Sequence, residues 1–500
     1  MTTKLEQFKK LLAEYTDLYR ANALVGWDQQ TYMPRGGAED RGYVLATLAG
    51  VAHEKFTSAE MGNLLDELIP QVKEMDPDSD DACIILRTKH DFDKQTKIPT
   101  EKVAEYAQVF TMAEVAWEHA REEKDFNLFK EDLKKIVDLR REYSSYFQPY
   151  DHIYDPQLDD FEPGLKTADV VKIFNKLRPQ QVALIKAIGE KPQIDSSFLD
   201  LKYDEKAQWA FGEEVITRFG FDWNRGRQDS SVHPFTTSFG IGDVRITTHV
   251  YPTNATSALF STMHEGGHAL YEQGVSTTLA RYPQATGASM AVHESQSRLW
   301  ENLVGRSMAF WKFFYPKFQQ TFSSQLGNVS LDQFYRAINK VQPSFIRTES
   351  DEATYNMHIM LRMELEIALL EGAIEVKDLP EAWNARMKEY LGVVPPDDRM
   401  GVLQDVHWSS GLMGYFPTYA LGNLISAQLW EKIESDIPTL DQQIESGRFD
   451  ELLGWLRGNI HRHGAKFEPQ VLVKRVTGSE IDPEPYMRYL NKKYGEIYSL

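Results

Sequence analysis

Hydrophobic residues recur every three or four positions along most of this chain. The first such segment carries an apolar stripe at Leu5, Phe8, Leu11, Leu12, Tyr15 and Leu18. This spacing is typical of an amphipathic α-helix that turns one face toward a core. Similar segments follow, separated by short polar turns such as Pro163-Gly164, which precedes a helix start at Thr167. The pattern predicts a mainly α-helical protein.

One region departs from the helical pattern. From Asp243 to Val250 apolar or β-branched residues alternate with other residues, as expected of a strand. Gly240 and Gly242 precede this strand and favour a hairpin turn. We therefore expect a small β-sheet here. An extended peptide could pair with an exposed edge of this strand, although a purely structural hairpin explains the pattern equally well.

The length of the chain, 500 residues, would by itself suggest about three domains. No Pro-rich or Ser/Gly-rich linker, low-complexity run or fixed-period repeat divides the sequence. We therefore expect a single domain over residues 1–500.

Composition and charge exclude several classes of partner. A net charge of -19 argues against nucleic acid, which requires clustered Lys and Arg. The sequence shows neither an apolar signal region nor a run of about 18 apolar residues, so we expect no membrane span. The single cysteine, Cys83, excludes an intramolecular disulfide and lies in an apolar run as a small core residue. These features predict a cytoplasmic protein.

The strongest candidate chemistry lies in a predicted helix over Thr256 to Tyr271. It contains His264-Glu265-Gly266-Gly267-His268. The two histidines are four positions apart and share a helix face, whereas Glu265 lies about 100° around the axis. This is the ligand pair and general base of a zinc peptidase. Two adjacent glycines cost roughly 1 kcal/mol each inside a helix, so we expect close approach of a neighbouring helix or of the substrate.

A catalytic zinc site needs a third protein ligand. Glu294 is our candidate, because it lies in a second helical segment that a turn near Pro283 would return to the first. His293 is the rival ligand, but adjacent helical residues diverge by about 100°, so only one of the two can face the metal. Glu294 could instead be half of an ion pair with Arg298.

Further motifs extend the pattern along the chain. Residues 27–34 read Trp-Asp-Gln-Gln-Thr-Tyr-Met-Pro, and six more stretches follow in one order, at residues 233–235, 243–247, 264–268, 293–296, 346–351 and 401–408. Together they resemble the carboxypeptidase Taq family of zinc metallocarboxypeptidases, and the resemblance extends through most of the chain.

The resemblance implies a fold and an activity. The fold is a large helical saddle with a deep central groove, similar to neurolysin and angiotensin-converting enzyme, in which helices within about residues 1–100 form one wall or lid. The activity is removal of C-terminal amino acids from peptides, with broad specificity and poor tolerance of proline. Zinc is the expected cofactor, cobalt can substitute for it, and a homodimer is expected.

The resemblance also suggests roles for individual residues. Glu265 is the general base. By analogy with related zinc peptidases, His407 and Tyr419 donate to the oxyanion, with Tyr415 close behind, although aromatic residues in such a loop could simply pack onto the core.

The substrate carboxylate also needs a receptor, for which we consider three residues of the family motifs. Arg347 is the leading candidate, and Arg245 and His233 are further substrate-binding candidates. These arginines could instead have a purely structural role, in ion pairs of Arg347 with Glu349 or Asp351 and of Arg245 with Asp243.

The sequence leaves several alternatives open. Glu301 and Asp351 are both possible outer partners of the zinc histidines. An oligoendopeptidase would use the same zinc and base but would cut internal bonds. A zinc-binding scaffold without turnover would not need Glu265.

Overall fold

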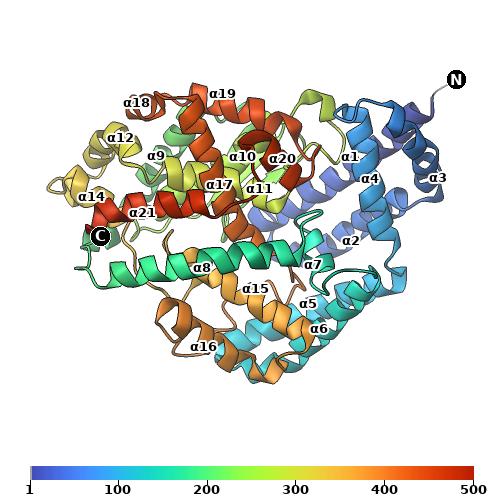
Figure 1. The fold of residues 1–500 in the computed structure, drawn as a ribbon, viewed down its shortest axis with the longest axis horizontal. Coiled ribbons are helices and arrows are strands. Elements are labelled where there is room, and N and C mark those ends of the chain that lie inside the picture. Colours follow the sequence, from blue (N-terminus) through green and yellow to red (C-terminus); the bar gives the residue numbers. More distant parts are fainter. Residues whose placement is uncertain (1–2) are drawn as a thin grey trace.

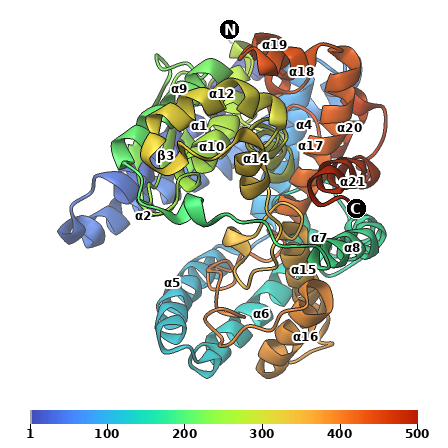
Figure 2. The same ribbon diagram turned by 90° about the vertical axis from the view of Figure 1, so that its left-hand side faces the viewer.

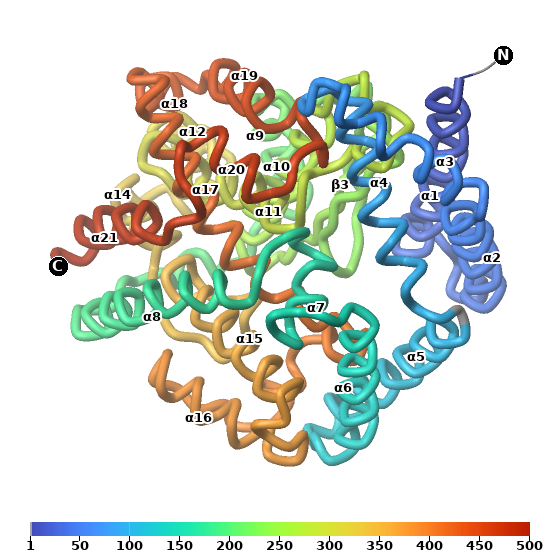
Figure 3. Tube along the Cα trace, turned by 45° about the vertical axis from the view of Figure 1, so that its right-hand side comes forward, coloured from blue at the N-terminus to red at the C-terminus, as the bar shows by residue number. Residues whose placement is uncertain are grey.

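The computed structural model describes residues 3–500 and consists mainly of helices, as predicted (Figure 1). The first helices, gathered at one side in Figure 3, form an N-terminal group. Their order is α1 (Lys4–Thr31), α2 (Ala38–Phe56), α3 (Ala59–Leu68) and α4 (Asp80–Thr96). The start of α1 is fixed by Thr3, whose hydroxyl accepts from the Glu6 amide while Glu6 accepts from the Thr3 amide.

The remaining helices fall into a lower and an upper group in Figure 2. The lower group contains α5 (Thr100–Glu123), α6 (Lys130–Ser145), α15 (Tyr355–Glu371) and α16 (Leu379–Leu391). Between the groups lie α7 (Asp155–Asp159) and α8 (Thr167–Gly189). The upper group contains α9 (Glu205–Phe219), α10 (Ser257–Gly274), α11 (Met290–Arg298), α12 (Met308–Thr321), α13 (Ser323–Leu326), α14 (Leu331–Ile338), α17 (Pro417–Asp436), α18 (Leu440–Glu445), α19 (Asp450–Asn459), α20 (Pro469–Thr477) and α21 (Glu484–Tyr498).

The small sheet has three strands, β1 (Gly226–Ser230), β2 (Thr236–Ser238) and β3 (Val244–Thr248), in the order β1-β3-β2. β2 and β3 are antiparallel, and the turn between them includes Gly240 at φ 130°, which confirms the predicted hairpin. β3 also pairs with β1 in parallel. The prediction that a peptide could pair with β3 is therefore wrong, because both of its edges are already occupied.

Two clusters of buried apolar side chains hold the elements together. The larger one spans residues 106–498 and includes the apolar faces of α10, α11, α15 and α17. The smaller one joins α1, α3 and α4 to residues 275–285, which follow α10. The N-terminal helices are thereby fixed beside the segment that connects α10 to α11. Within residues 3–500, no helix combines the length and the apolar character needed to cross a bilayer.

Candidate metal centre and active site

The predicted helix over 256–271 is α10, and its two glycines allow close packing on both sides. A Cβ on Gly267 would lie 2.7 Å from the Gln296 carbonyl oxygen of α11, and a Cβ on Gly266 would lie 2.9 Å from Ile216 of α9. The bare backbone therefore serves the approach of neighbouring helices, which is one of the two alternatives that the sequence left open. This contact brings α11 alongside the histidines of α10.

Replacing Gly267 with Ala should force α10 and α11 apart. We expect the free energy of unfolding to fall by about 1–3 kcal/mol and metal affinity to fall with it, as measured by denaturant unfolding and a chelator competition titration. The control is Gly454→Ala in α19, where a Cβ would meet nothing within 4 Å. That variant should be neutral or more stable by up to about 1 kcal/mol. Equal stability of the two variants would contradict this packing role.

Three donor atoms meet where the two helices touch. The Oε2 atom of Glu294 lies 3.5 Å from Nε2 of His264 and 3.5 Å from Nε2 of His268. One ligand atom from each of the three residues lies within 4.8 Å of the others. Two imidazole nitrogens and one carboxylate oxygen are the donor set of a catalytic zinc site that keeps a fourth position open. The residues therefore fit a zinc ion.

The outer nitrogens of both histidines have partners. Nδ1 of His264 lies 2.9 Å from Glu301, which is carried by a π-helical turn (Leu299–Val304) after α11. Nδ1 of His268 lies 2.6 Å from Nδ1 of His293, whose Nε2 lies 2.9 Å from Glu272. Such partners fix the tautomer and orientation of a metal-binding histidine.

These contacts decide among the predicted outer partners. Of the two candidates, Glu301 is the partner of His264. Asp351 is not, because it accepts from the amides of Gln342 and Thr354. His293, the rival ligand, lies behind His268, at a position that sequence reasoning missed.

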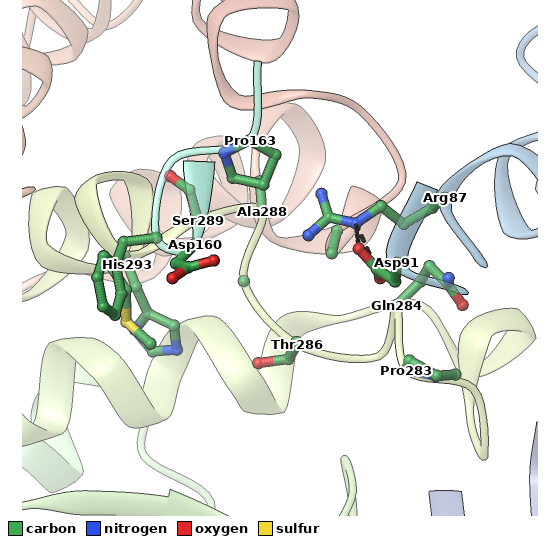
Figure 4. Close-up of a pocket in the computed structure, with 14 residues that line it drawn as sticks. Arg87, Asp91, Asp160, Pro163, Pro283, Gln284, Thr286, Ala288, Ser289 and His293 are labelled. Carbon is green, nitrogen blue, oxygen red and sulfur yellow. Dashed lines mark hydrogen bonds and ion pairs between the residues drawn. The ribbon is translucent and has the colours of Figure 1, made fainter. Parts of the chain in front are cut away.

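His293 also lines a cavity of about 180 Å³ that α4 and residues 283–290 help to enclose (Figure 4). Charged side chains face it, among them the ion pair of Arg87 with Asp91, together with Asp160. None of the three donor residues lines this cavity. It is therefore separate from the candidate metal centre.

Glu294 is buried and ionised. Its Oε1 accepts from Nε of Arg298 at 2.7 Å, so the ion pair predicted as an alternative exists beside the contacts to both histidines. Although burial opposes its charge, Arg298 and His264 hold the pKa of the Glu294 carboxyl well below its ordinary value. Burial lowers the pKa of His268 to about 3, so this imidazole is neutral and its lone pair is free for a metal.

Glu265 lies on the neighbouring face of α10 and is only 7% exposed. Its Oε2 accepts from the hydroxyl of Thr236 in β2 at 2.6 Å, a contact that the sequence did not suggest. Burial raises the pKa of Glu265, which brings this carboxyl closer to the range of a general base.

α17 brings Tyr419, one of the three predicted oxyanion donors, to α11. A Cβ on Gly422 would lie 2.6 Å from Cγ of Glu294, so this glycine permits the contact between the two helices. One turn earlier, the Tyr419 hydroxyl lies 3.4 Å from Nε2 of His407, and the Tyr415 ring packs edge-on against that of Tyr419. The three predicted donors therefore form one cluster beside the third ligand.

Arg347 lies in the same cluster and is 6% exposed. Its Nε and Nη2 donate to Asp405 at 3.1 and 2.8 Å, and its Nη1 donates to the Tyr355 hydroxyl at 2.8 Å. The predicted alternative, an ion pair with Glu349 or Asp351, names the wrong residues, because Asp405 is the partner. The Arg298 guanidinium lies 4.5 Å from the centre of the Tyr355 ring, which links Arg347 to the candidate metal centre.

The other two predicted substrate residues lie in the sheet region. Arg245 of β3 forms a two-point ion pair with Asp243, with both distances 2.8 Å, as the alternative interpretation predicted. Its guanidinium also lies 4.3 Å from the centre of the Trp27 ring of α1. His233 lies between β1 and β2 and is exposed. The structure brings neither residue into the contacts described above.

Comparison with known proteins agrees with this geometry. Residues 7–494 match the model of the family described as Carboxypeptidase Taq (M32) metallopeptidase. Thermostable carboxypeptidase 1 of Thermus thermophilus is 41% identical over 95% of each chain, and Carboxypeptidase 1 of Bacillus subtilis is 37% identical over 99% of each chain. The crystal structure of an M32 carboxypeptidase from Deinococcus radiodurans R1 superposes with a TM-score of 0.96 at 41% identity, covering 100% of both chains. The chain therefore belongs to the carboxypeptidase Taq (M32) family of metallopeptidases and is a metallocarboxypeptidase.

Proposed function

We propose that this enzyme removes C-terminal amino acids from peptides with a zinc ion held by His264, His268 and Glu294. The observation that carries the proposal is the convergence of these three donors beside a buried glutamate, Glu265. When bound, zinc would lower the pKa of a coordinated water and polarise the scissile carbonyl. A scaffold without turnover would not need Glu265 beside the donors.

The side chains around the donors have separate tasks in this proposal. Glu265 accepts the proton of the attacking water and returns it to the departing amine. His407 and Tyr419 stabilise the negative charge that develops on the carbonyl oxygen, and Tyr415 is the alternative donor. The support for this pairing is the 3.4 Å contact between His407 and Tyr419.

Arg347 binds the terminal carboxylate of the substrate. Asp405 and Tyr355 accept three of the five guanidinium N–H groups, so two remain for a carboxylate. Burial makes each of these bonds stronger than it would be in water. This receptor favours an exopeptidase over the alternative oligoendopeptidase, which would have no use for a buried carboxylate receptor.

β2 replaces β3 as the strand that pairs with the substrate backbone. It forms an edge of the sheet, and its Thr236 hydroxyl touches Glu265. A peptide that pairs along this edge would run past the general base. Arg245 and His233 remain proposed contacts for the substrate on this side.

The finer properties rest on the family resemblance. They are use of zinc with cobalt as a substitute, broad specificity with poor cleavage at proline, a cytoplasmic location, a homodimer, and a single domain with a central groove. The role of helices within about residues 1–100 as one wall or lid of that groove is supported by two contacts: Trp27 of α1 packs on Arg245, and Tyr32, which follows α1, donates to Asp229 of β1.

Time-resolved mass spectrometry of one long peptide tests the proposed reaction. We expect single amino acids to appear stepwise from the C-terminus, and we expect an internal proline to stall the ladder. Internal fragments as the first products would show an endopeptidase instead.

The Arg347→Ala variant tests the carboxylate receptor. Two lost charge-assisted hydrogen bonds at about 1.5 kcal/mol each should lower kcat/KM on free-terminus peptides by roughly 10²-fold, whereas the rate on amidated peptides should change little. Asp405 keeps its second partner, Arg362, so the fold should survive. The control is Arg336→Ala, which removes a surface arginine bonded to Asp332. An equal loss of activity on free and amidated peptides would contradict the assignment.

A further inference from the structure

α15 contacts the active-site cluster at three points along one face. Tyr355 accepts from Arg347, Arg362 donates to Asp405 at 2.8 and 2.5 Å, and Glu366 accepts from the loop that follows Asp405. These positions are seven and four residues apart, which is the spacing of one helix face. The first two contacts hold Arg347. The third holds a different part of the cluster.

Glu366 anchors the loop of residues 407–415 at both ends. Its Oε1 accepts from the indole N–H of Trp408 at 2.8 Å, and its Oε2 accepts from the backbone amide of Gly414 at 3.1 Å. Trp408 follows His407, and Gly414 precedes Tyr415. One carboxylate therefore fixes the neighbours of two proposed oxyanion donors.

Glu366 forms no ion pair with a described residue. It is fully buried, and no cation lies within ion-pair distance of it in residues 3–500. Besides the loop, the Tyr154 hydroxyl donates to Oε2 at 2.5 Å, and Arg140 of α6 acts only at longer range. A buried carboxylate without a counterion is costly, so a purely structural anchor would be served as well by a neutral acceptor.

Gly414 shows how tightly the loop is held. Its φ is 90°, and a Cβ there would lie 2.3 Å from the Gln157 carbonyl oxygen. Gly414 therefore packs between Gln157 of α7 on one side and Glu366 on the other. A small shift of Gly414 would move Tyr415 directly.

We propose that Glu366 is a positioning residue whose ionised carboxylate holds His407 and Tyr415 in their catalytic arrangement. The inference rests on the oxyanion roles proposed above for this loop. The ionised form offers only acceptors, which match the three donors from Trp408, Gly414 and Tyr154. A protonated carboxyl brings a fourth hydrogen to the same place and leaves one donor without a partner.

The pH dependence follows from the environment of Glu366. Burial raises its pKa to about 7, against the smaller opposing effects of its three donors and Arg140. The loop is therefore held firmly above neutral pH and loosened below it. The free energy of unfolding depends on pH in the opposite direction. Because the pKa of Glu366 is raised in the folded state, the contribution of this group to stability declines as pH rises from about 4.5 through 7.

The Glu366→Gln variant tests the proposal on the metal-saturated enzyme. The amide nitrogen of Gln points two N–H groups at groups that are themselves donors, so we expect kcat at pH 8 to fall about tenfold or more. KM should stay within about twofold, because Arg347 is held by other residues. At pH 6 most wild-type Glu366 is protonated, so the deficit of the variant should shrink to about twofold. The melting-temperature difference, variant minus wild type, should increase from pH 5 to pH 8.

Glu364→Gln is the matched control on the same helix. Glu364 accepts from Tyr390 at 2.6 Å and pairs with Arg178, away from the loop. We expect kcat and its pH profile to match the wild type. If Glu366→Gln does not fold, Trp408→Phe removes one anchoring donor while keeping an aromatic ring, and kcat should fall at constant KM.

Two results would overturn the inference. The first is an unchanged kcat in Glu366→Gln, or in Trp408→Phe if Glu366→Gln does not fold. The second is a loss of kcat that is equal at pH 6 and pH 8. His407→Ala and Tyr415→Phe distinguish this failure from failure of the proposed function. If both are slow while Glu366→Gln is normal, only the anchor is wrong, whereas if all three are normal, the loop has no catalytic role.

Discussion

Glu265→Gln should lower kcat by between about 10²- and 10⁴-fold, the usual contribution of a positioned general base. The amide cannot accept a proton, but it has the size of the carboxylate and can still accept from the Thr236 hydroxyl, which lies 2.6 Å away. Metal content and melting temperature should therefore stay close to those of the wild type. Steady-state kinetics with metal analysis of the same preparation measures both.

Thr236→Val is the companion variant. It removes the hydroxyl that orients Glu265 but leaves the carboxylate, so we expect a loss of kcat smaller than that of Glu265→Gln. A Glu265→Gln enzyme with normal turnover would show that another group accepts the proton. Loss of metal in this variant would instead make Glu265 a ligand.

Glu294→Ala should have the second large effect, on metal affinity and on folding. One of three ligands is lost, so the metal dissociation constant should rise by more than about 10²-fold, beyond the loss expected for an outer partner. In the metal-free protein the buried Arg298 would lose its closest partner, which costs roughly 3–5 kcal/mol for a buried pair. Arg298 still lies 3.3 Å from Glu301, so we expect the lower end of that range.

His293→Ala separates the two rival ligands. Of the three candidate ligands, His293 contacts only His268, through the outer ring nitrogen, so its loss should weaken metal binding by about 10- to 100-fold and no more. Competition titrations with a chromogenic chelator give both constants. A Glu294→Ala protein that keeps its metal while His293→Ala loses it would reverse the assignment.

The convergence of His264, His268 and Glu294 followed from local rules. Helical periodicity placed both histidines on one face, and the turn before α11 returned Glu294 to them. The Arg298 pair was predictable for the same reason, because it lies four residues along the same helix. Such spacing fixes directions without tertiary information.

The contacts that the sequence did not predict join segments far apart in the chain. Asp405 meets Arg347 across 58 positions, and Thr236 meets Glu265 across 29 positions, so no local period reports them. The central place of β3 depended on β1, whose polar sequence Gly-Arg-Gln-Asp-Ser does not suggest a strand. The sequence presents His293 only as a rival ligand, although a histidine next to Glu294 can equally support His268 through its outer ring nitrogen.

Anomalous diffraction at the zinc absorption edge tests the central claim most directly. In crystals of the zinc-loaded enzyme we predict one anomalous peak per chain, at about 2.0–2.2 Å from Nε2 of His264, Nε2 of His268 and the Glu294 carboxylate. A peak within bonding distance of His293, or one beyond bonding distance of the Glu294 carboxylate, would contradict the proposed ligand set.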